Sequence, residues 1–115
     1  MSDAGPQLRW RDFLMPYTST PVRLAQVRRD AVSGAVTALV RFPPGWSRDV
    51  PVVYAADEQF VLLSGELHMN GTVHRPGVRV TVPGGTARSA SSTPCGAVAL
   101  AWFSSDPNAV RPAGY

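Results

Sequence analysis

Residues 51–65 read PVVYAADEQFVLLSG, and this stretch decides the fold. Asp57 and Glu58 stand directly before a strand-like apolar run that ends at Gly65. The two acids either cap a buried strand, or Glu58 is the first residue of that strand. Successive side chains of a strand point to opposite faces, so Glu58, Phe60 and Leu62 share one face. A carboxylate on the apolar face of a strand needs a function, and the question is whether Glu58 faces inward.

The rest of the chain extends this reading, because 11 prolines and 10 glycines divide it into short pieces without sustained helical periodicity. Short apolar runs between turns are typical of a β-sandwich or β-barrel. We expect strands over residues 22–28, 35–42, 58–69, 78–82 and 97–103, with Gly65 as a bend inside the third. The fold class is therefore predicted to be all-β.

Turn residues and length set the domain organisation. Asn70-Gly71 is the strongest hairpin signal in the chain. A length of 115 residues predicts a single domain over 1–115, with a core of about residues 20–105. Residues 1–9 and 106–115 are expected to be flexible tails. The segment 8–15, LRWRDFLM, is too apolar for a free tail and is expected to pack against the barrel or a partner copy.

Composition excludes several function classes. All 11 basic residues are arginine, and they are scattered rather than clustered into the basic stripe that nucleic-acid binding needs. No apolar run approaches the roughly 20 residues that span a bilayer. The lone Cys95 rules out an internal disulfide, and no signal peptide is evident, so a cytoplasmic protein without nucleic-acid or membrane partners is expected.

Two glycine-framed motifs resemble those of the cupins, which are double-stranded β-helix (jelly-roll) barrels. The first runs from Gly45 through WSRDV, Pro51-Val52-Val53, YAAD, Glu58 and QFVLLS to Gly65. The second runs from Gly77 through VRVTV, Pro83-Gly84-Gly85, TA, Arg88 and SAS to Ser92. The match extends over residues 34–104. The amino-acid sequence within it resembles that of RmlC-like cupins and especially that of ChrR-type cupins.

The departures from the cupin pattern concern the metal. In metal-binding cupins two histidines, a glutamate and a third histidine hold the ion, and in this register the corresponding residues are Pro51, Val53, Glu58 and Arg88. Proline and valine offer no lone pair, and arginine stays cationic. The resemblance thus implies the fold without a metal or other cofactor.

The same resemblance places Glu58 on the lumen wall with Arg88 entering from the neighbouring sheet. One interpretation is that the two only neutralise each other. The other is a polar ligand, since a buried ion pair is rarely a net gain over apolar residues. Arg88 suits a carboxylate, enolate or phenolate, and Glu58 suits a general acid or base. Both are our candidate catalytic residues, and Arg88 is also a candidate ligand-binding residue.

Further candidates for ligand binding are aromatic. Phe60 shares the face of Glu58, Tyr54 could reach the mouth of the lumen, and Trp46 could form the floor under a planar ligand. Packing roles for Tyr54 and Trp46 are the alternatives. His68 and His74 flank the hairpin and are expected to be solvated, on the outer surface of the barrel or at the hairpin. A surface metal site formed by the two histidines is unsupported. Cys95 is expected in a turn with a structural role.

The strand at 97–103 bears on the volume of the lumen. Ala97, Ala99 and Ala101 share one face, and the larger side chains that include Trp102 share the other. If the alanines face inward, a small ring-sized molecule has room. If Trp102 faces inward, the lumen is filled.

Two function classes follow. The first is a metal-independent cupin enzyme of isomerase, cyclase or lyase type, acting on a small anionic or polyfunctional molecule. The second is a non-catalytic small-molecule-binding or regulatory module. A homodimer is expected in either case, as cupins commonly pair through sheet faces and N-terminal strands.

Overall fold

The computed structural model describes residues 8–113, and all of its regular structure is β. The strands are β1 (Trp10–Phe13), β2 (Val22–Arg29), β3 (Val36–Phe42), β4 (Trp46–Arg48), β5 (Val52–Tyr54), β6 (Glu58–Gly65), β7 (Leu67–Met69), β8 (Thr72–His74), β9 (Arg79–Val82), β10 (Ala87–Arg88), β11 (Ser91–Thr93), β12 (Ala97–Phe103) and β13 (Val110–Pro112). This confirms the all-β prediction. Within residues 8–113 no helix is long and apolar enough to cross a membrane.

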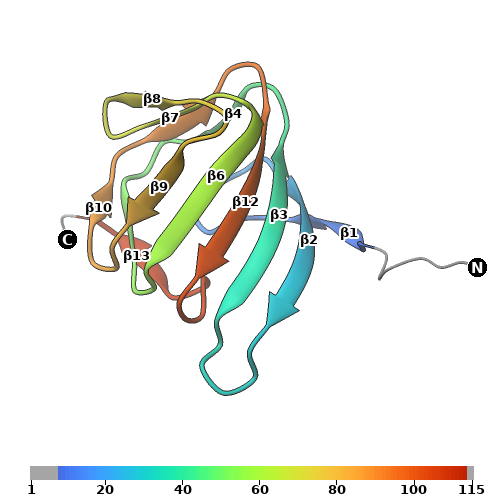
Figure 1. Ribbon diagram of the computed structural model, residues 1–115. Coiled ribbons are helices and arrows are strands. Elements are labelled where there is room, and N and C mark those ends of the chain that lie inside the picture. The colour runs from blue at the N-terminus through green and yellow to red at the C-terminus, as the bar shows by residue number, and fades with distance from the viewer. Residues whose placement is uncertain (1–7, 114–115) are drawn as a thin grey trace, which may run out of the picture.

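One layer of the molecule is a six-stranded sheet in the order β1-β2-β3-β12-β6-β9. All of its neighbouring strands run antiparallel. Figure 1 shows β9, β6, β12, β3 and β2 side by side, with β1 at the edge. The sheet therefore joins strands that are far apart in the sequence.

The second layer consists of two smaller sheets, β10-β5-β13 and β4-β11-β7-β8. In Figure 1 the labelled strands β7, β8 and β10 lie to the left of β6, beyond or above β9. The strands thus form three separate sheets rather than one hydrogen-bonded ring, and the lumen lies between the packed layers. This is the jelly-roll arrangement that the sequence predicts.

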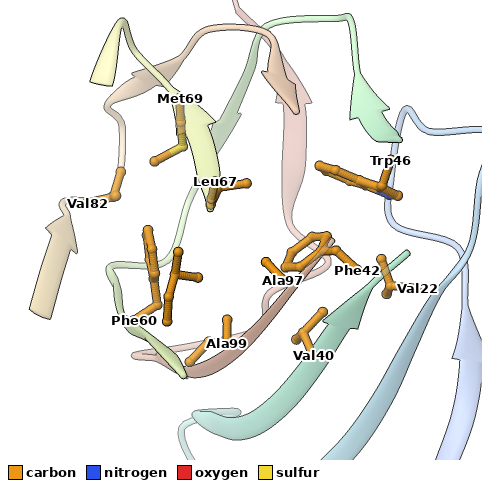
Figure 2. Close-up of a cluster of buried hydrophobic side chains, with 12 residues drawn as sticks. Val22, Val40, Phe42, Trp46, Phe60, Leu67, Met69, Val82, Ala97 and Ala99 are labelled. Atoms are coloured by element: carbon orange, nitrogen blue, oxygen red, sulfur yellow. The ribbon is translucent and has the colours of Figure 1, made fainter. Parts of the chain in front are cut away.

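Strand alternation fills the space between the layers. Along β6 the side chains of Glu58, Phe60 and Leu62 are buried, whereas Gln59 and Leu63 are exposed. Figure 2 shows the apolar side chains of both layers pointing toward one another. The inward-facing residue at the start of β6 is therefore a carboxylate among apolar neighbours.

Two predicted turns are confirmed. Asn70 and Gly71 link β7 to β8 with φ angles of 53° and 73°, as expected of a two-residue hairpin loop with both residues left-handed. Gly65 separates β6 from β7 with a φ of 77°, and the two strands belong to different sheets. Cys95 lies in the exposed turn between β11 and β12, also as predicted.

The ends of the chain differ from expectation. Residues 110–112 form β13, which pairs with β5, so the C-terminal tail prediction is wrong for this part. The N-terminal segment does pack on the sheet, because Trp10–Phe13 pairs with β2. The ordered core thus extends beyond residues 20–105 on both sides, while residues 1–7 of the predicted N-terminal tail and residues 114–115 lie outside the described part.

Candidate functional site

The short strand β5 sets one wall of the lumen. Val52 pairs directly with Arg88, and Val53 pairs with the exposed Ala87 and Arg111. Directly opposed residues share a face of the sheet. Val52, Arg88 and, two residues on, Tyr54 therefore face inward, and Val53 faces away.

This register corrects the sequence analysis. Of the residues around the two motif positions, Val52 and Tyr54 share the lumen face with Arg88, whereas Pro51 is exposed and Val53, although buried, lies on the other face. The physical reason is the pleat, because a shift of one residue moves a side chain to the other face.

Glu58 faces the lumen from the start of β6, where it pairs with Val82 of β9 and Phe103 of β12. Nη1 of Arg88 donates a hydrogen bond to Oε1 of Glu58. Glu58 is 7% exposed and Arg88 is 5% exposed. The structure thus brings together the two residues that the sequence analysis placed in one lumen.

Much of the Arg88 guanidinium remains free. Its centre lies 4.0 Å from the centroid of the Tyr54 ring, a cation–π contact. Its Nε and Nη2 atoms are buried and have no hydrogen-bond partner among the described residues. A buried donor without a partner costs free energy, so these two N–H groups indicate a place for an acceptor from outside the chain.

A second buried arginine, Arg48, was missed by the sequence analysis. It is 4% exposed, and its Nη1 donates to the Tyr54 hydroxyl at 2.9 Å and to the Pro16 carbonyl at 3.4 Å. No carboxylate among residues 8–113 forms an ion pair with it. Its spacing in the sequence could have predicted the inward position of Arg48, because it lies two residues after Trp46 and therefore on the same face of β4.

The protonation of Glu58 reflects these surroundings. Burial raises the pKa of Glu58 above its ordinary value of 4.5, although the charge and hydrogen bond of Arg88 and the charge of Arg48 act in the opposite direction. With two arginines and one carboxyl group, the lumen has a net positive charge in either protonation state of Glu58.

The space beside these groups is a cavity of about 50 Å³, which we call the inner cavity. Its lining residues are Met15, Val40, Phe42, Trp46, Arg48, Tyr54, Glu58, Phe60, Leu67, Met69, Arg88, Ser91, Ala99, Ala101 and Phe103. The alanine face of β12 looks inward, as Figure 2 shows for Ala97 and Ala99. A benzene-sized ring needs about 150 Å³, so the inner cavity is too small for the ring-sized molecule that the inward-facing alanines predicted. Large side chains from the facing strands occupy that space.

The aromatic candidates have different surroundings. Trp46 is 2% exposed and packs edge-on against Phe42, with ring centroids 4.8 Å apart. Phe60 lines the inner cavity and packs edge-on against His74 at 5.6 Å. Tyr54 stacks on Phe103 at 6.0 Å. All three predicted aromatic residues therefore line the inner cavity, and Trp46 and Phe60 also belong to the hydrophobic core.

The two histidines lie on the β7–β8 hairpin, outside the lumen lining. His68 is half-exposed, with its Nε2 atom 3.5 Å from Glu66. His74 is only partly exposed, and burial lowers its pKa. His74 therefore lies at the hairpin, as one of the two expected positions, but it is not fully solvated because its ring packs on Phe60.

The donor set of the lumen does not fit a transition metal. Neither Pro51 and Val53 nor their inward-facing neighbours Val52 and Tyr54 are histidines or carboxylates, so Glu58 beside Arg88 is the one carboxylate of this set. Zinc, iron and manganese sites need about three or more protein ligands. Among residues 8–113 no group of three or more His, Cys, Asp or Glu side chains is placed to hold a metal ion.

Comparison of the sequence with known families gives no match to a family model. A comparison with curated proteins likewise gives no match.

Comparison of the structure identifies similar folds at low sequence identity. A candidate dioxygenase from Nostoc punctiforme has a TM-score of 0.83 and 14% identity over 94% of this chain, which spans only 38% of that protein. The polyketide cyclase RemF from Streptomyces resistomycificus has a TM-score of 0.75 and 12% identity, over 100% of this chain and 87% of RemF.

A third similar structure is an RmlC-like cupin from Shewanella frigidimarina, with a TM-score of 0.69 and 17% identity over 89% of this chain and 87% of that one. At such identities the likeness concerns the fold. The arrangement of the two layers around a lumen agrees with it, and the chain has the fold of the cupin superfamily.

Proposed function

We propose that this protein is a metal-independent enzyme that moves a proton on a small anionic or polyfunctional organic molecule in the lumen, as an isomerase, cyclase or lyase does. One observation carries the proposal: a buried carboxyl group with a raised pKa lies beside an arginine whose Nε and Nη2 have no partner among the described residues. Enzyme function of some kind is also in keeping with the cupin-fold neighbours, which include a cyclase.

The two groups have complementary roles in this chemistry. Ionised Glu58 accepts a proton from the carbon next to a carbonyl or carboxylate group of the bound molecule. The electron pair of the broken C–H bond moves to the carbonyl oxygen, and the free N–H groups of Arg88 stabilise the resulting enolate. Glu58 then returns the proton to a different atom of the molecule, which gives an isomer. Alternatively, the enolate breaks a neighbouring bond, as in a lyase, or forms a new ring bond, as in a cyclase. The step needs no oxidant or reductant.

Burial prepares Glu58 for this role. A general base works best when its pKa is near the working pH, and burial raises the pKa of Glu58 in that direction.

We also propose a cytoplasmic location, on the ground that the exposed Cys95 suits a reducing compartment. Fractionation of the native host would test the location, and recovery outside the cytoplasm would contradict it.

Proton exchange in heavy water tests the chemistry without knowledge of the natural substrate. We expect the parent protein to catalyse exchange of the α-protons of some members of a panel of small 2-oxo and 3-oxo acids, followed by proton NMR. Glu58→Gln should reduce the exchange rate at least about hundredfold, as expected for loss of a general base. Glu66→Gln, on the surface, is the matched control and should leave the rate unchanged. A chelator should not change the rate of the parent protein.

The outcomes separate the two function classes. Binding of panel members that depends on Arg88, without any exchange, would overturn the enzyme proposal in favour of a binding or regulatory module. Loss of exchange on addition of chelator would overturn the metal-independent chemistry.

A further inference from the structure

We propose that the ligand is an extended carboxylate, with its head group in the inner cavity and an apolar body in a second cavity that opens beside it. This inference rests on the proposed function, because it names the substrate class of the same site.

The second cavity, which we call the outer cavity, has a volume of about 220 Å³. Residues of β1, β2 and β3 line it, together with residues 106–108. Its apolar lining includes Phe13, Val22, Leu24, Val36 and Ala38. Such a surface is suited to hydrocarbon rather than to a compact polar molecule.

The two cavities share four lining residues, Met15, Val40, Tyr54 and Phe103. These side chains therefore form the boundary between the cavities. Tyr54 holds a central place in it, because its ring stacks on Phe103 and its hydroxyl accepts a hydrogen bond from Arg48. A molecule that extends from one cavity into the other passes this boundary.

Size requires both cavities to be used. The inner cavity of about 50 Å³ holds a head group of a few atoms, and ligand pockets usually start near 300 Å³. The outer cavity supplies most of the missing volume. A ligand confined to the inner cavity would be smaller than typical substrates.

Charge fixes the direction in which the ligand lies. Arg88 lines the inner cavity, and its buried Nε and Nη2 atoms have no hydrogen-bond partner among the described residues, so we assign the anionic head to this cavity. Arg11, Arg29 and Asp106 line the outer cavity, and no carboxylate among the described residues forms an ion pair with either arginine. The two exposed arginines outnumber the one carboxylate, so the charge of this lining attracts an anion.

A chain-length series of straight-chain carboxylates, from acetate to octanoate, tests the inference by calorimetry. We expect the dissociation constant to fall about threefold to fourfold for each added methylene between four and eight carbons, because each one leaves water for the outer cavity. The amides of the same lengths should bind at least about tenfold more weakly, since a neutral head does not pair with Arg88.

A blocking variant and its control localise the effect. Gln26→Trp places a large side chain at an exposed position on the wall of the outer cavity. This variant should bind acetate as the parent does, but its affinity should no longer increase with the chain length of the carboxylate. Gln59→Trp, at an exposed position that lines neither cavity, should retain the gain.

The results distinguish this inference from the proposed function. If acetate binds and Arg88→Leu abolishes its binding, but longer chains bind no better, the two-cavity inference is wrong and the lumen site stands. The inference also fails if Gln26→Trp keeps the full gain. If no carboxylate of any length binds, the anion site itself is wrong, and the proposed function fails with it.

Discussion

At the residue scale, the unusual feature is a carboxyl group that remains buried between two arginines. Taking Glu58 out of water raises its pKa, and the neighbouring positive charges of Arg88 and Arg48 only partly offset this effect. The balance makes the proton affinity of Glu58 sensitive to any anion that enters the lumen. An anion paired with Arg88 would weaken the favourable charge interaction and raise the proton affinity further.

The raised pKa makes stability depend on pH. Folding takes up a proton at Glu58 between its ordinary pKa of 4.5 and the higher pKa of the folded state. The free energy of unfolding should therefore fall as pH rises through this window, by up to about 1.4 kcal/mol per pH unit. Glu58→Gln keeps an acceptor for Arg88 but does not titrate, so its stability should lack this component.

Urea unfolding of both proteins between pH 4 and 9 measures the difference. The stability of the parent minus that of Glu58→Gln should decrease with pH through the window and then level off. A difference that stays constant or increases over that range would show that the pKa is not raised.

At the scale of elements, the bend at Gly65 lets one run of sequence supply strands to both layers. A Cβ atom at Gly65 would lie 2.0 Å from the carbonyl oxygen of Gly96, and the φ of 77° is left-handed. The close approach allows β6 to pair with β12 up to the bend while β7 enters the other layer. The conformation is thus a requirement of the fold rather than a local preference.

A pair of substitutions separates the close contact from the backbone conformation. Gly65→Ala should destabilise the protein by about 2–5 kcal/mol, since it adds a clash with backbone to the cost of a left-handed alanine. Gly71→Ala is the matched control, because Gly71 has a similar φ of 73° and no atom near the position of its Cβ. It should cost about 1–2 kcal/mol. Equal losses in thermal or urea unfolding would contradict the contact.

At the scale of the whole molecule, the six-stranded sheet ends in an edge strand. No strand of the described residues pairs with the outer side of β1, and Leu14 directly after it is 56% exposed. Unpaired strand edges invite pairing with another chain. The homodimer expected from the sequence therefore remains a proposal, for which this edge is the candidate surface.

Light scattering after size-exclusion chromatography tests the dimer. We expect the parent protein to have twice its chain mass of 12.3 kDa, and Leu14→Lys to shift it toward the monomer. Val32→Lys is the control, as Val32 is 98% exposed in the loop between β2 and β3. A parent protein of 12.3 kDa at all concentrations tested would exclude the homodimer.

Features that depend on local periodicity and turn chemistry could be predicted from the amino-acid sequence alone. Alternation along residues 58–62 put Glu58 on the face of Phe60 and Leu62, and the resemblance to the cupins implied that this face looks inward. Asn70-Gly71 marked a hairpin, because its signal lies within two residues of the chain. The two glycine-framed motifs also identified Arg88 as the partner of Glu58. The roles of these residues in binding or catalysis remain predictions.

Features that depend on the pairing of strands remote in the sequence could not be predicted and follow from the folded arrangement. The one-residue register of β5, which brings Tyr54 rather than Val53 to the lumen, follows from the pairing of β5 with β10 and β13. The buried position of Arg48 beside Tyr54 and the small inner cavity depend on how the layers pack. A strand pattern determines which side chains share a face, but distances across a lumen arise from contacts between segments far apart in the sequence.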